Sequence, residues 1–407
     1  MKVWMVIWSY YPEPEGGAEH QCRLICPFLI DQGVDITIVT ARLSWQKKRS
    51  ISHEKSDVSH LGLFVPLFSF LIKNSLSLVN LLLQNSKHDQ LKQILSFWLV
   101  LPWVWLSRLN FMLEFAIFAK MSSKDIAVYH VHETGWLGAF VSLVGKLFSV
   151  PVLCKEATYP SFPPLGWDVP FHWFLRRYQK QAHYIALNST VKKDIIANGC
   201  PSEKVTVISN AVLLPENISR PERSKVVLYV GNFSQGAHQK GFDVLFKAWK
   251  QVTHNTFDLK LVMAGGGASD SWQSLVRELG CEESVLFAGF VDTPSTLYLE
   301  AAMLVLPSRV EGMSNALLEA MSFGLPVVVS DIPANLAVVE NGRNGLVVAV
   351  NDSPALADAI IDFMQNPTKR KEFGRCGREI VGKRYNPTTV SSDLVDFYGN
   401  ISTKRLP

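Results

Sequence analysis

The sequence predicts an α/β protein built from two doubly wound, Rossmann-like domains that face each other across a cleft. Three observations lead to this fold. The chain has 407 residues, more than a single core usually holds, so two domains of about 200 residues are expected. Apolar, strand-like runs alternate with helical stretches in both halves of the chain, which is typical of parallel sheets. A segment with two prolines and little apolar content, 210–224, separates the two series.

The first domain is expected to open with a strand, a helix and a second strand. An apolar run at 3–8 precedes a loop that ends at Gly17, and a helical stretch at 18–32 stops at Gly33 before a strand at 35–40. Such an order begins a doubly wound sheet, in which ligands are met beyond the carboxyl ends of the strands.

Residues 61–119 interrupt this alternation with unusually apolar sequence. Its two apolar runs carry only three charges, Lys73, Arg108 and Glu114. Three arrangements are open: helices packed in the domain, helices that also touch the membrane interface, and a membrane-spanning hairpin. Pro102 divides the second run, which argues against a span. The spacing of an amphipathic helix also argues against a span, and it is found at Leu91, Ile94, Leu95, Trp98 and Leu99. The tryptophans of this stretch favour the interface.

The second domain is predicted from a further series of apolar runs with helical stretches between them. These runs lie at 226–230, 259–264, 285–287, 303–306, 327–330 and 346–350. A later helix is expected to begin with Ser353 as its cap and Pro354 in its first position.

Charge and cysteine content narrow the class of protein. Residues 1–210 hold 21 Lys and Arg against 15 Asp and Glu, so the net charge of +4 comes from the first half. This excess suits an anionic membrane face better than nucleic acid, for which no motif is present, although ordinary surface charge explains it equally well. The six cysteines are dispersed and the first strand lacks a signal-cleavage site, so a cytoplasmic protein with free thiols is expected.

The run at 311–330 has the most informative chemistry. Glu311 lies in a glycine-containing loop and Glu319 follows in a helix, and eight helical steps return a side chain to about the same face. Carboxylates accept hydrogen bonds from sugar hydroxyls, and a helix N-terminus binds phosphate. Two glutamates at this spacing alone are common on amphipathic helices. The prediction of a site for a sugar joined to a diphosphate therefore depends on the whole run, including the strand that Pro326 initiates.

Three further loops could complete this site. Gly16 and Gly17 precede the first helix, and Gly265 follows a strand, so the backbone can approach a ligand closely at both places. Lys240 lies in a loop after the strand at 226–230, where its charge could stabilise a leaving diphosphate. His130 and His132 end another strand. We expect them to point to opposite sides, so that only one faces the ligand.

These motifs resemble those of the family-four retaining glycosyltransferases (group 1), which have the GT-B fold. The resemblance rests on the E-x7-E of Glu311 and Glu319, the G-G-A-E at 16–19, the H-x-H-E at 130–133 and the Lys-Gly at 240–241. It implies that His132, Lys240 and Glu311 are catalytic, while His130 is expected to be a core histidine. It also implies donor contacts from Gly16, Gly17, Asn232, Gly265, Arg309, Gly312, Met313, Ser314, Asn315 and Glu319.

The resemblance also implies the organisation of the chain. The first domain, 1–210, would bind a glycan or lipid-linked acceptor, and a linker at 211–224 would lead to the nucleotide-sugar domain, 225–384. Residues 385–407 would return as a helix to the first domain. Asn-Ala-Val at 210–212 departs from the usual P-N-G-V, which puts the linker geometry in doubt.

The implied reaction is a retaining hexosyl transfer in surface polysaccharide assembly at the cytoplasmic face of the membrane. A UDP-sugar is expected in preference to a GDP-sugar, with no cofactor and no metal, since no D-x-D occurs. Asn232 replaces the arginine usual in the family, which leaves Lys240 with less help unless Arg309 contributes. Two alternatives are a sugar-nucleotide epimerase, which needs no acceptor, and an inactive binding module.

Overall fold

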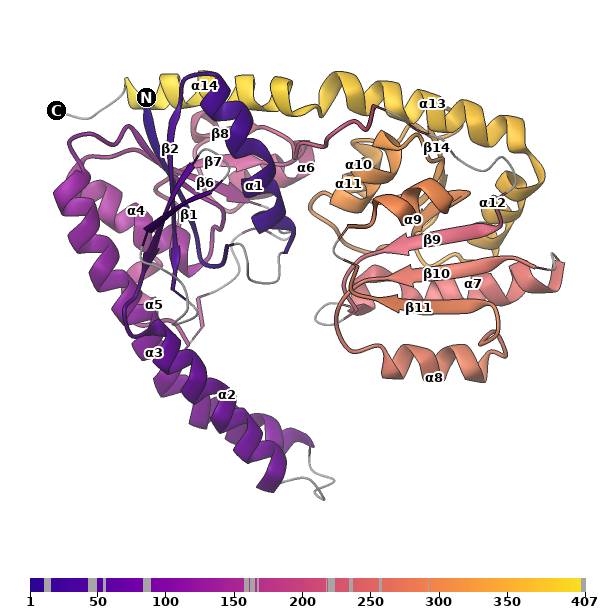
Figure 1. Cartoon of the computed structure of the whole chain (residues 1–407), viewed down its shortest axis with the longest axis horizontal. Helices are drawn as coiled ribbons and strands as arrows, with labels where there is room; N and C mark the ends of the chain where they lie inside the picture. Colours follow the sequence, from indigo (N-terminus) through magenta and orange to yellow (C-terminus); the bar gives the residue numbers. More distant parts are fainter. Residues whose placement is uncertain are drawn as a thin grey trace. The chain divides into compact units, whose positions relative to one another are not determined.

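The computed structural model describes residues 1–10, 16–42, 50–53, 56–82, 89–156, 161, 165–166, 168–216, 218, 224–233, 237–255, 258–291 and 293–403. These residues form two compact units, each with its own sheet and helices (Figure 1). The first unit comprises 1–187, 191–208 and 391–407, and the second comprises 188–190 and 209–390. The predicted α/β fold with two Rossmann-like units is confirmed.

The sheet of the first unit has eight strands in the order β3-β4-β2-β1-β5-β6-β7-β8. All neighbours are parallel except β3 and β4. The strands are β1 (Lys2–Ile7), β2 (Asp35–Ala41), β3 (Ser50–His53), β4 (Ser56–Leu61), β5 (Val128–Val131), β6 (Val152–Glu156), β7 (His183–Ala186) and β8 (Val205–Val207). The order reverses between β1 and β5, which is the kind of switch point at which open parallel sheets bind ligands.

Helices of the first unit connect and cover these strands. They are α1 (Gly17–Asp31), α2 (Val65–Leu82), α3 (Asp89–Ser122), α4 (Trp136–Phe148), α5 (His172–Leu175) and α6 (Ser189–Ala197), with a 3-10 turn, η1 (Ser202–Lys204). The end of the chain adds α14 (Pro387–Ser402), which joins this unit from Ser391 onward. The fully buried Tyr398 of α14 packs in this unit. The sequence did not predict the antiparallel strand β3, a short edge strand.

The apolar stretch of the first unit forms an antiparallel pair of helices, α2 and α3. Near its C-terminal end, α3 packs on the sheet, with Phe115 and Phe118 against Trp4. Contrary to the expectation from sequence, α3 continues through Pro102. Leu95, Trp98 and Leu99, which have amphipathic spacing, are exposed. Their amphipathic spacing therefore does not correspond to a face that the domain covers.

The sheet of the second unit has six parallel strands in the order β11-β10-β9-β12-β13-β14. The predicted runs lie within two residues of the observed strands, because the inner strands are buried on both faces and almost continuously apolar, and the more exposed edge strand β11 is apolar as well. These strands are β9 (Val226–Val230), β10 (Lys260–Ala264), β11 (Val285–Gly289), β12 (Met303–Leu306), β13 (Val327–Ser330) and β14 (Gly345–Val348).

Helices alternate with the strands of the second unit. They are α7 (Phe242–Asn255), α8 (Asp270–Glu278), α9 (Ser295–Glu300), α10 (Asn315–Ser322), α11 (Pro333–Leu336), α12 (Ser353–Gln365) and α13 (Pro367–Arg384), with a 3-10 turn, η2 (Ala237–Lys240). One predicted cap is corrected. Asp352, not Ser353, caps α12, because its side chain accepts the backbone N–H of Ala355 at 2.9 Å.

Candidate functional site

The second unit gathers its predicted site residues at a switch point of its sheet. Strand order reverses between β9 and β12, and the loops that follow these two strands meet beyond their carboxyl ends. The first loop leads to Lys240 in η2, and the second carries Glu311 before α10. Open parallel sheets bind ligands at such a point. Residues 234–236 of the first loop lie outside the described residues.

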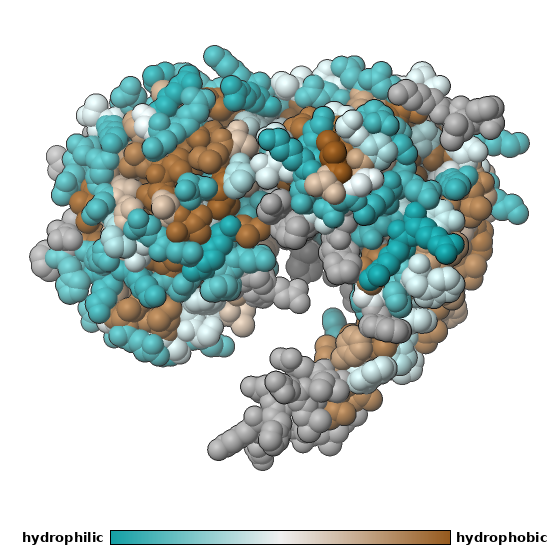
Figure 2. All heavy atoms as spheres, turned by 180° about the vertical axis from the view of Figure 1, so that it is seen from behind, coloured by the Kyte–Doolittle hydropathy of each residue, from teal (hydrophilic) through white to brown (hydrophobic). Residues whose placement is uncertain are grey.

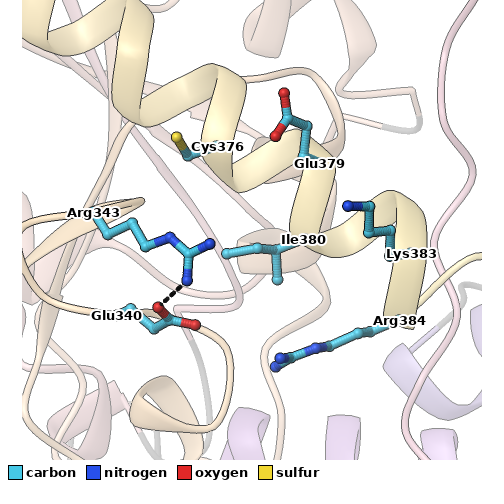
Figure 3. Close-up of a pocket in the computed structure, with 7 residues that line it drawn as sticks. All are labelled: Glu340, Arg343, Cys376, Glu379, Ile380, Lys383 and Arg384. Carbon is cyan, nitrogen blue, oxygen red and sulfur yellow. Dashed lines mark hydrogen bonds and ion pairs between the residues drawn. The ribbon is translucent and has the colours of Figure 1, made fainter.

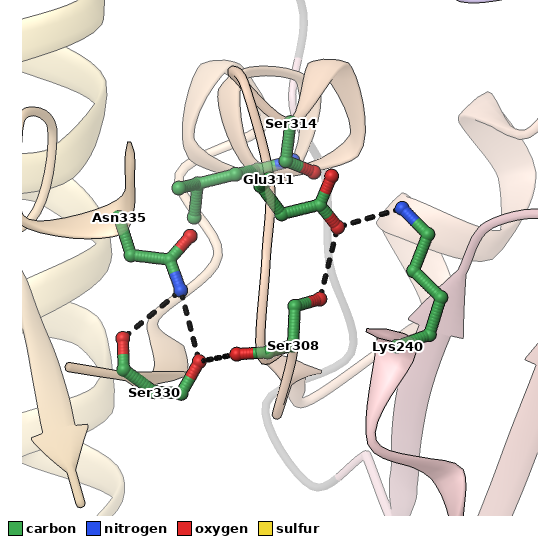
Figure 4. A network of polar contacts seen from close by, with 7 residues as sticks. Lys240, Ser308, Glu311, Ser314, Ser330 and Asn335 are labelled. Atoms are coloured by element: carbon green, nitrogen blue, oxygen red, sulfur yellow. Dashed lines mark hydrogen bonds and ion pairs between the residues drawn. The ribbon is translucent and has the colours of Figure 1, made fainter. Parts of the chain in front are cut away.

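A chain of polar contacts joins these loops (Figure 4). The Lys240 ammonium lies 2.7 Å from Glu311 Oε1, which also accepts the Ser308 hydroxyl at 2.9 Å. Behind it, Ser330 donates to the Ser308 carbonyl, and the Asn335 amide donates to the Ser330 carbonyl at 3.0 Å. Side-chain exposures of 27 % for Lys240 and 13 % for Glu311 leave the pair reachable from solvent. The structure therefore brings together two of the three residues predicted to be catalytic.

Arg309 fixes the loops instead of presenting a free charge. Its guanidinium binds both carboxylate oxygens of Asp243, at 2.9 and 2.8 Å, and its Nε donates to Asn351 at 2.7 Å. The same guanidinium donates to the His238 carbonyl, and the Arg309 backbone N–H donates to the Gln239 carbonyl at 2.6 Å. Bonding to Arg309 lowers the pKa of Asp243. Arg309 thus clamps η2, which carries Lys240, onto the β12 loop.

Two glycines allow the loops to approach this closely. Gly241 has a φ of +70°, and a Cβ there would lie 2.1 Å from the Pro307 carbonyl oxygen. A Cβ at Gly265 would lie 1.8 Å from the Gly231 carbonyl oxygen. Gly265 was predicted as an approach point for the nucleotide. Its contact with Gly231 gives a structural reason for a glycine in this position.

Glu319 lies in α10, but it does not share a helical face with Glu311. The helix begins only at Asn315, after Ser314, whose extended backbone and side chain cap it by accepting from the Leu317 N–H at 3.3 Å. The argument from eight helical steps is therefore wrong, because Glu311 precedes the cap. Glu319 accepts the hydroxyl of the buried Tyr298 at 2.8 Å. Burial raises the pKa of Glu319, and the bond from Tyr298 opposes this shift.

The remaining predicted residues of the second unit surround α10 and β9. Gly312 is buried, Met313 packs against the core, and Asn315 accepts from the Asn210 amide at 2.8 Å. Asn232 is exposed at the end of β9. Asn232 directly follows Gly231, beyond the carboxyl end of β9, and the same loop leads on to Lys240.

In the first unit, the predicted glycines start α1. Gly16 is the N-cap residue and Gly17 the first helical residue. Glu19 Oε2 accepts the Gly16 N–H at 3.0 Å, so a carboxylate already occupies the helix start where a diphosphate was predicted. An anionic ligand there would have to displace Glu19. Residues 11–15 of the predicted loop lie outside the described residues.

His130 and His132 lie on the same side of β5, not on opposite sides. Their rings stack with centroids 4.6 Å apart and planes 15° apart. The prediction is wrong because residues two apart along a strand share a face. His130 is buried and its Nδ1 lies 2.7 Å from the Tyr398 hydroxyl, which confirms it as a core histidine. Burial is the main cause that lowers the pKa of His130 well below its ordinary value.

Sequence reasoning missed a cluster of ionisable groups beside these histidines. Burial raises the pKa of Glu133 to about 7, although the nearby Arg108 and the Leu137 N–H oppose the shift. Glu156, at the end of β6, is buried and accepts the Thr134 hydroxyl. Burial also lowers the pKa of the neighbouring Lys155 to about 8. The Glu that follows H-x-H in the sequence was the signal that could have identified Glu133.

A pocket of about 200 Å³ elsewhere in the second unit does not coincide with this site (Figure 3). It lies between α13 and the turn that carries Glu340 and Arg343, which pair at 2.5 Å. None of its lining residues follows a strand end at the switch point. Among the described residues, no group of three or more His, Cys, Asp or Glu could hold a metal ion.

The segment that carries this site also matches known proteins. Residues 224–366, which contain Lys240, Glu311 and Glu319, match the family model for group 1 glycosyl transferases. The part of the chain that carries the site therefore resembles the group 1 glycosyltransferases. It is 31% identical over 192 residues to the phosphatidyl-myo-inositol mannosyltransferase of Mycobacterium leprae, covering 46% of this chain and 50% of that protein.

A further relative and two solved structures extend the similarity. A lipopolysaccharide 1,6-galactosyltransferase of Salmonella typhimurium is 30% identical over 60% of this chain and 65% of its own length. The chain spans about half of the length of the first curated relatives. Sucrose-phosphate synthase from Thermosynechococcus elongatus has a TM-score of 0.74 at 17% identity, covering 99% of both chains. Anabaena HepE with UDP and glucose has a TM-score of 0.71 at 16% identity, covering 98% of this chain and 100% of its own. These two structures show the fold.

Proposed function

We propose that this chain transfers a hexose from a nucleotide-sugar to a hydroxyl of a glycan or lipid-linked acceptor, with retention of anomeric configuration. The observation that carries the proposal is the Lys240–Glu311 pair, held 2.7 Å apart at the sheet switch point within the segment that matches the family. The pair places a cation and a carboxylate on neighbouring loops. A sugar diphosphate needs both groups.

In this mechanism each residue has one task. Lys240 uses its remaining N–H donors to stabilise the leaving diphosphate, together with first-turn N–H groups of α10. Glu311 holds a donor-sugar hydroxyl, and Glu319 binds the ribose. His132 borders the sugar. The leaving phosphate helps to deprotonate the acceptor hydroxyl as the bond to the anomeric carbon breaks, so no carboxylate nucleophile is needed. Arg309 is a positioning residue in this scheme, because its guanidinium is bound to Asp243.

We propose UDP as the nucleotide and a surface polysaccharide or glycolipid as the product, made at the cytoplasmic face of the membrane. The UDP complex of Anabaena HepE supports the nucleotide, and the names of the Salmonella and Mycobacterium relatives support the product class.

The first test is thermal stabilisation by UDP, GDP and ADP, since a ligand that binds only the native state raises the melting temperature. Stabilisation by UDP that is weakened in Glu319→Ala supports the donor site. Glu278→Ala, an exposed helical glutamate, is the matched control. Glu319→Gln keeps an acceptor for Tyr298 and separates ribose binding from stability. Transfer is then measured with UDP-hexoses, and the anomeric configuration of the product is read by NMR. No stabilisation of a folded protein by any nucleotide would refute the proposal.

A further inference from the structure

Helix α3 carries apolar side chains on two opposite faces, of which only one is covered. Phe111, Phe115 and Ala119, spaced by four residues, pack fully buried in the core of the first unit. The other face is exposed along its length, by 40 to 80 % at Leu95, Leu99, Leu106, Leu113, Ile117 and Met121. This stripe is about 40 Å long at 1.5 Å per residue. The outer face of a helix in water is normally polar.

Two of the three charges between Leu95 and Met121 are used inside the unit, and the third, Lys120, is exposed. Arg108 Nη1 lies 2.6 Å from Asp168 Oδ2, and its guanidinium lies 5.0 Å from the Trp136 ring centroid. The Glu114 carboxylate accepts the backbone N–H groups of Gly62 and Leu63, at 3.0 and 2.6 Å. The side chains of Arg108 and Glu114 therefore do not make the exposed stripe polar.

Helix α2 extends the same kind of surface. It packs beside α3 (Figure 1), and Leu67, Phe70 and Leu76 on α2 are exposed, as is Phe64 just before it. Figure 2 shows apolar residues along this arm of the first unit. Among the residues of these helices whose exposure is described, the exposed charged side chains are Lys73 and Lys120, both cationic.

The segment around α5 adds aromatic and basic groups to the first unit. Asp168, the partner of Arg108, is followed by Phe171 and Trp173, which are 51 and 65 % exposed. Arg176, Arg177 and Lys180 follow and are also exposed. Tryptophan beside arginine and lysine is the composition of proteins that sit at the headgroup level of an anionic bilayer.

We propose that the α2–α3 hairpin docks on an anionic lipid bilayer, with its exposed apolar stripe in the boundary between headgroups and acyl chains. A second copy of the chain fits the surface less well. A coiled-coil seam is a narrow stripe flanked by charges, whereas here the exposed Trp98 flanks the stripe, and Phe97, on another side of the helix, is exposed as well. A lipid surface accepts such a broad apolar face.

The hairpin lies on the bilayer and does not span it. One helix, Leu95–Ser122, is long and apolar enough to cross a membrane, and 22% of its most apolar window is buried. Its residues from Ser107 to Ala119 include a face packed on the protein core, so lipid cannot surround them. The remainder of α3, from residue 89 to 106, is shorter than the roughly 20 residues that a span requires.

Binding of the full chain to vesicles tests this proposal independently of catalysis. The variant Trp98→Ser, Leu113→Ser, Ile117→Ser replaces three exposed side chains, and the matched control Leu213→Ser, Leu286→Ser replaces two with exposures of 56 and 57 % on the second unit. Co-sedimentation is measured with vesicles of phosphatidylcholine and phosphatidylglycerol in equal amounts, and with phosphatidylcholine alone. Melting temperature and stabilisation by UDP report whether each variant is folded.

The expected result is strong binding of the wild type and control to the anionic vesicles, and at least a roughly tenfold lower partition coefficient for the triple variant. Neutral vesicles and high salt should also weaken binding. Equal binding of all three proteins would overturn the proposal. So would a lipid-independent dimer in sedimentation equilibrium that the triple variant abolishes, which would identify a second copy as the occupant. Retention on vesicles after an alkaline wash would overturn interfacial docking in favour of a span.

Discussion

The two strand-end sites of this protein hold their ionisable groups in opposite ways. At the switch point of the second unit, cations and carboxylates pair with each other, as in Lys240 with Glu311 and Arg309 with Asp243. At the switch point of the first unit, burial dominates: it raises the pKa of Glu133 and lowers the pKa of His130. Direct charge pairing keeps groups ionised, whereas desolvation favours their neutral forms.

This difference has two consequences. Paired charges at fixed positions suit a diphosphate, whose charge does not change with pH near neutrality. Groups whose pKa values are shifted toward neutrality make the first unit sensitive to pH in that range. The comparison therefore predicts that substitutions in the second unit mainly affect turnover, and that substitutions in the first unit mainly change the response to pH.

Of the substitutions considered, Lys240→Ala should have the largest effect on turnover, because it removes the cation of the Lys240–Glu311 pair. Loss of the cation near the leaving group is expected to lower kcat by about 10²- to 10³-fold, measured as sugar transfer from a UDP-hexose. Arg343→Ala is the matched control, because Arg343 also pairs with a glutamate but lies in the pocket away from the site. A loss below tenfold for Lys240→Ala would show that the leaving group is stabilised elsewhere.

Glu133→Gln should change how the unfolding free energy depends on pH, and so test the role of burial in the first unit. The wild-type carboxyl has its pKa raised from 4.5 to about 7, so the folded state binds more protons between these values. Its contribution is favourable below pH 4.5 and is lost as pH rises through 7, at a cost of roughly 3 kcal/mol at pH 8.

The Gln variant lacks this cost and should be more stable than the wild type at pH 8 but not at pH 4.5. Urea unfolding at four pH values measures the difference. Glu203→Gln, on an exposed turn, should leave the pH dependence unchanged. Parallel curves for wild type and Glu133→Gln would show that Glu133 titrates as an ordinary carboxyl.

Tyr398→Phe should weaken the first unit by about 1 to 3 kcal/mol. The change removes the hydroxyl that lies 2.7 Å from His130 Nδ1 and leaves that buried nitrogen without its partner. Because the His130 ring stacks on His132, the pH profile of transfer should also shift. Chemical denaturation and a pH–rate profile measure both effects, with the partly buried Tyr178→Phe as control. An unchanged profile would show that Tyr398 stabilises the unit without positioning His132.

Arg309→Lys should give the smallest effect, about 1 kcal/mol in unfolding free energy and a severalfold drop in kcat. Lysine keeps the charge but cannot bind both oxygens of Asp243, so η2 is held less firmly. Because Arg309 lowers the pKa of Asp243, this stability is present above the ordinary carboxyl pKa and is lost as pH falls through the folded value. Arg375→Lys, in an exposed pair, is the control. Full activity of Arg309→Lys would show that the clamp is dispensable.

The sequence by itself determined the strands of the second unit and the loops that carry the site. Parallel strands covered on both faces are almost continuously apolar, and the edge strand β11 is apolar as well, so β9 to β14 could be predicted to within two residues. The spacing of Glu311, Glu319 and Lys240 then placed these residues after particular strands. These properties are local, and a pattern of residue types is enough to predict them.

Only the tertiary structure decided which groups meet and which face remains open. The pairing of Arg309 with Asp243, 66 residues away, depends on how two loops pack. The raised pKa of Glu133 depends on burial beneath other elements. Likewise, Phe115 and Ile117 in α3 are both apolar, yet one is buried and the other exposed. Burial arises from contacts between distant segments, and residue types along one helix do not specify those contacts.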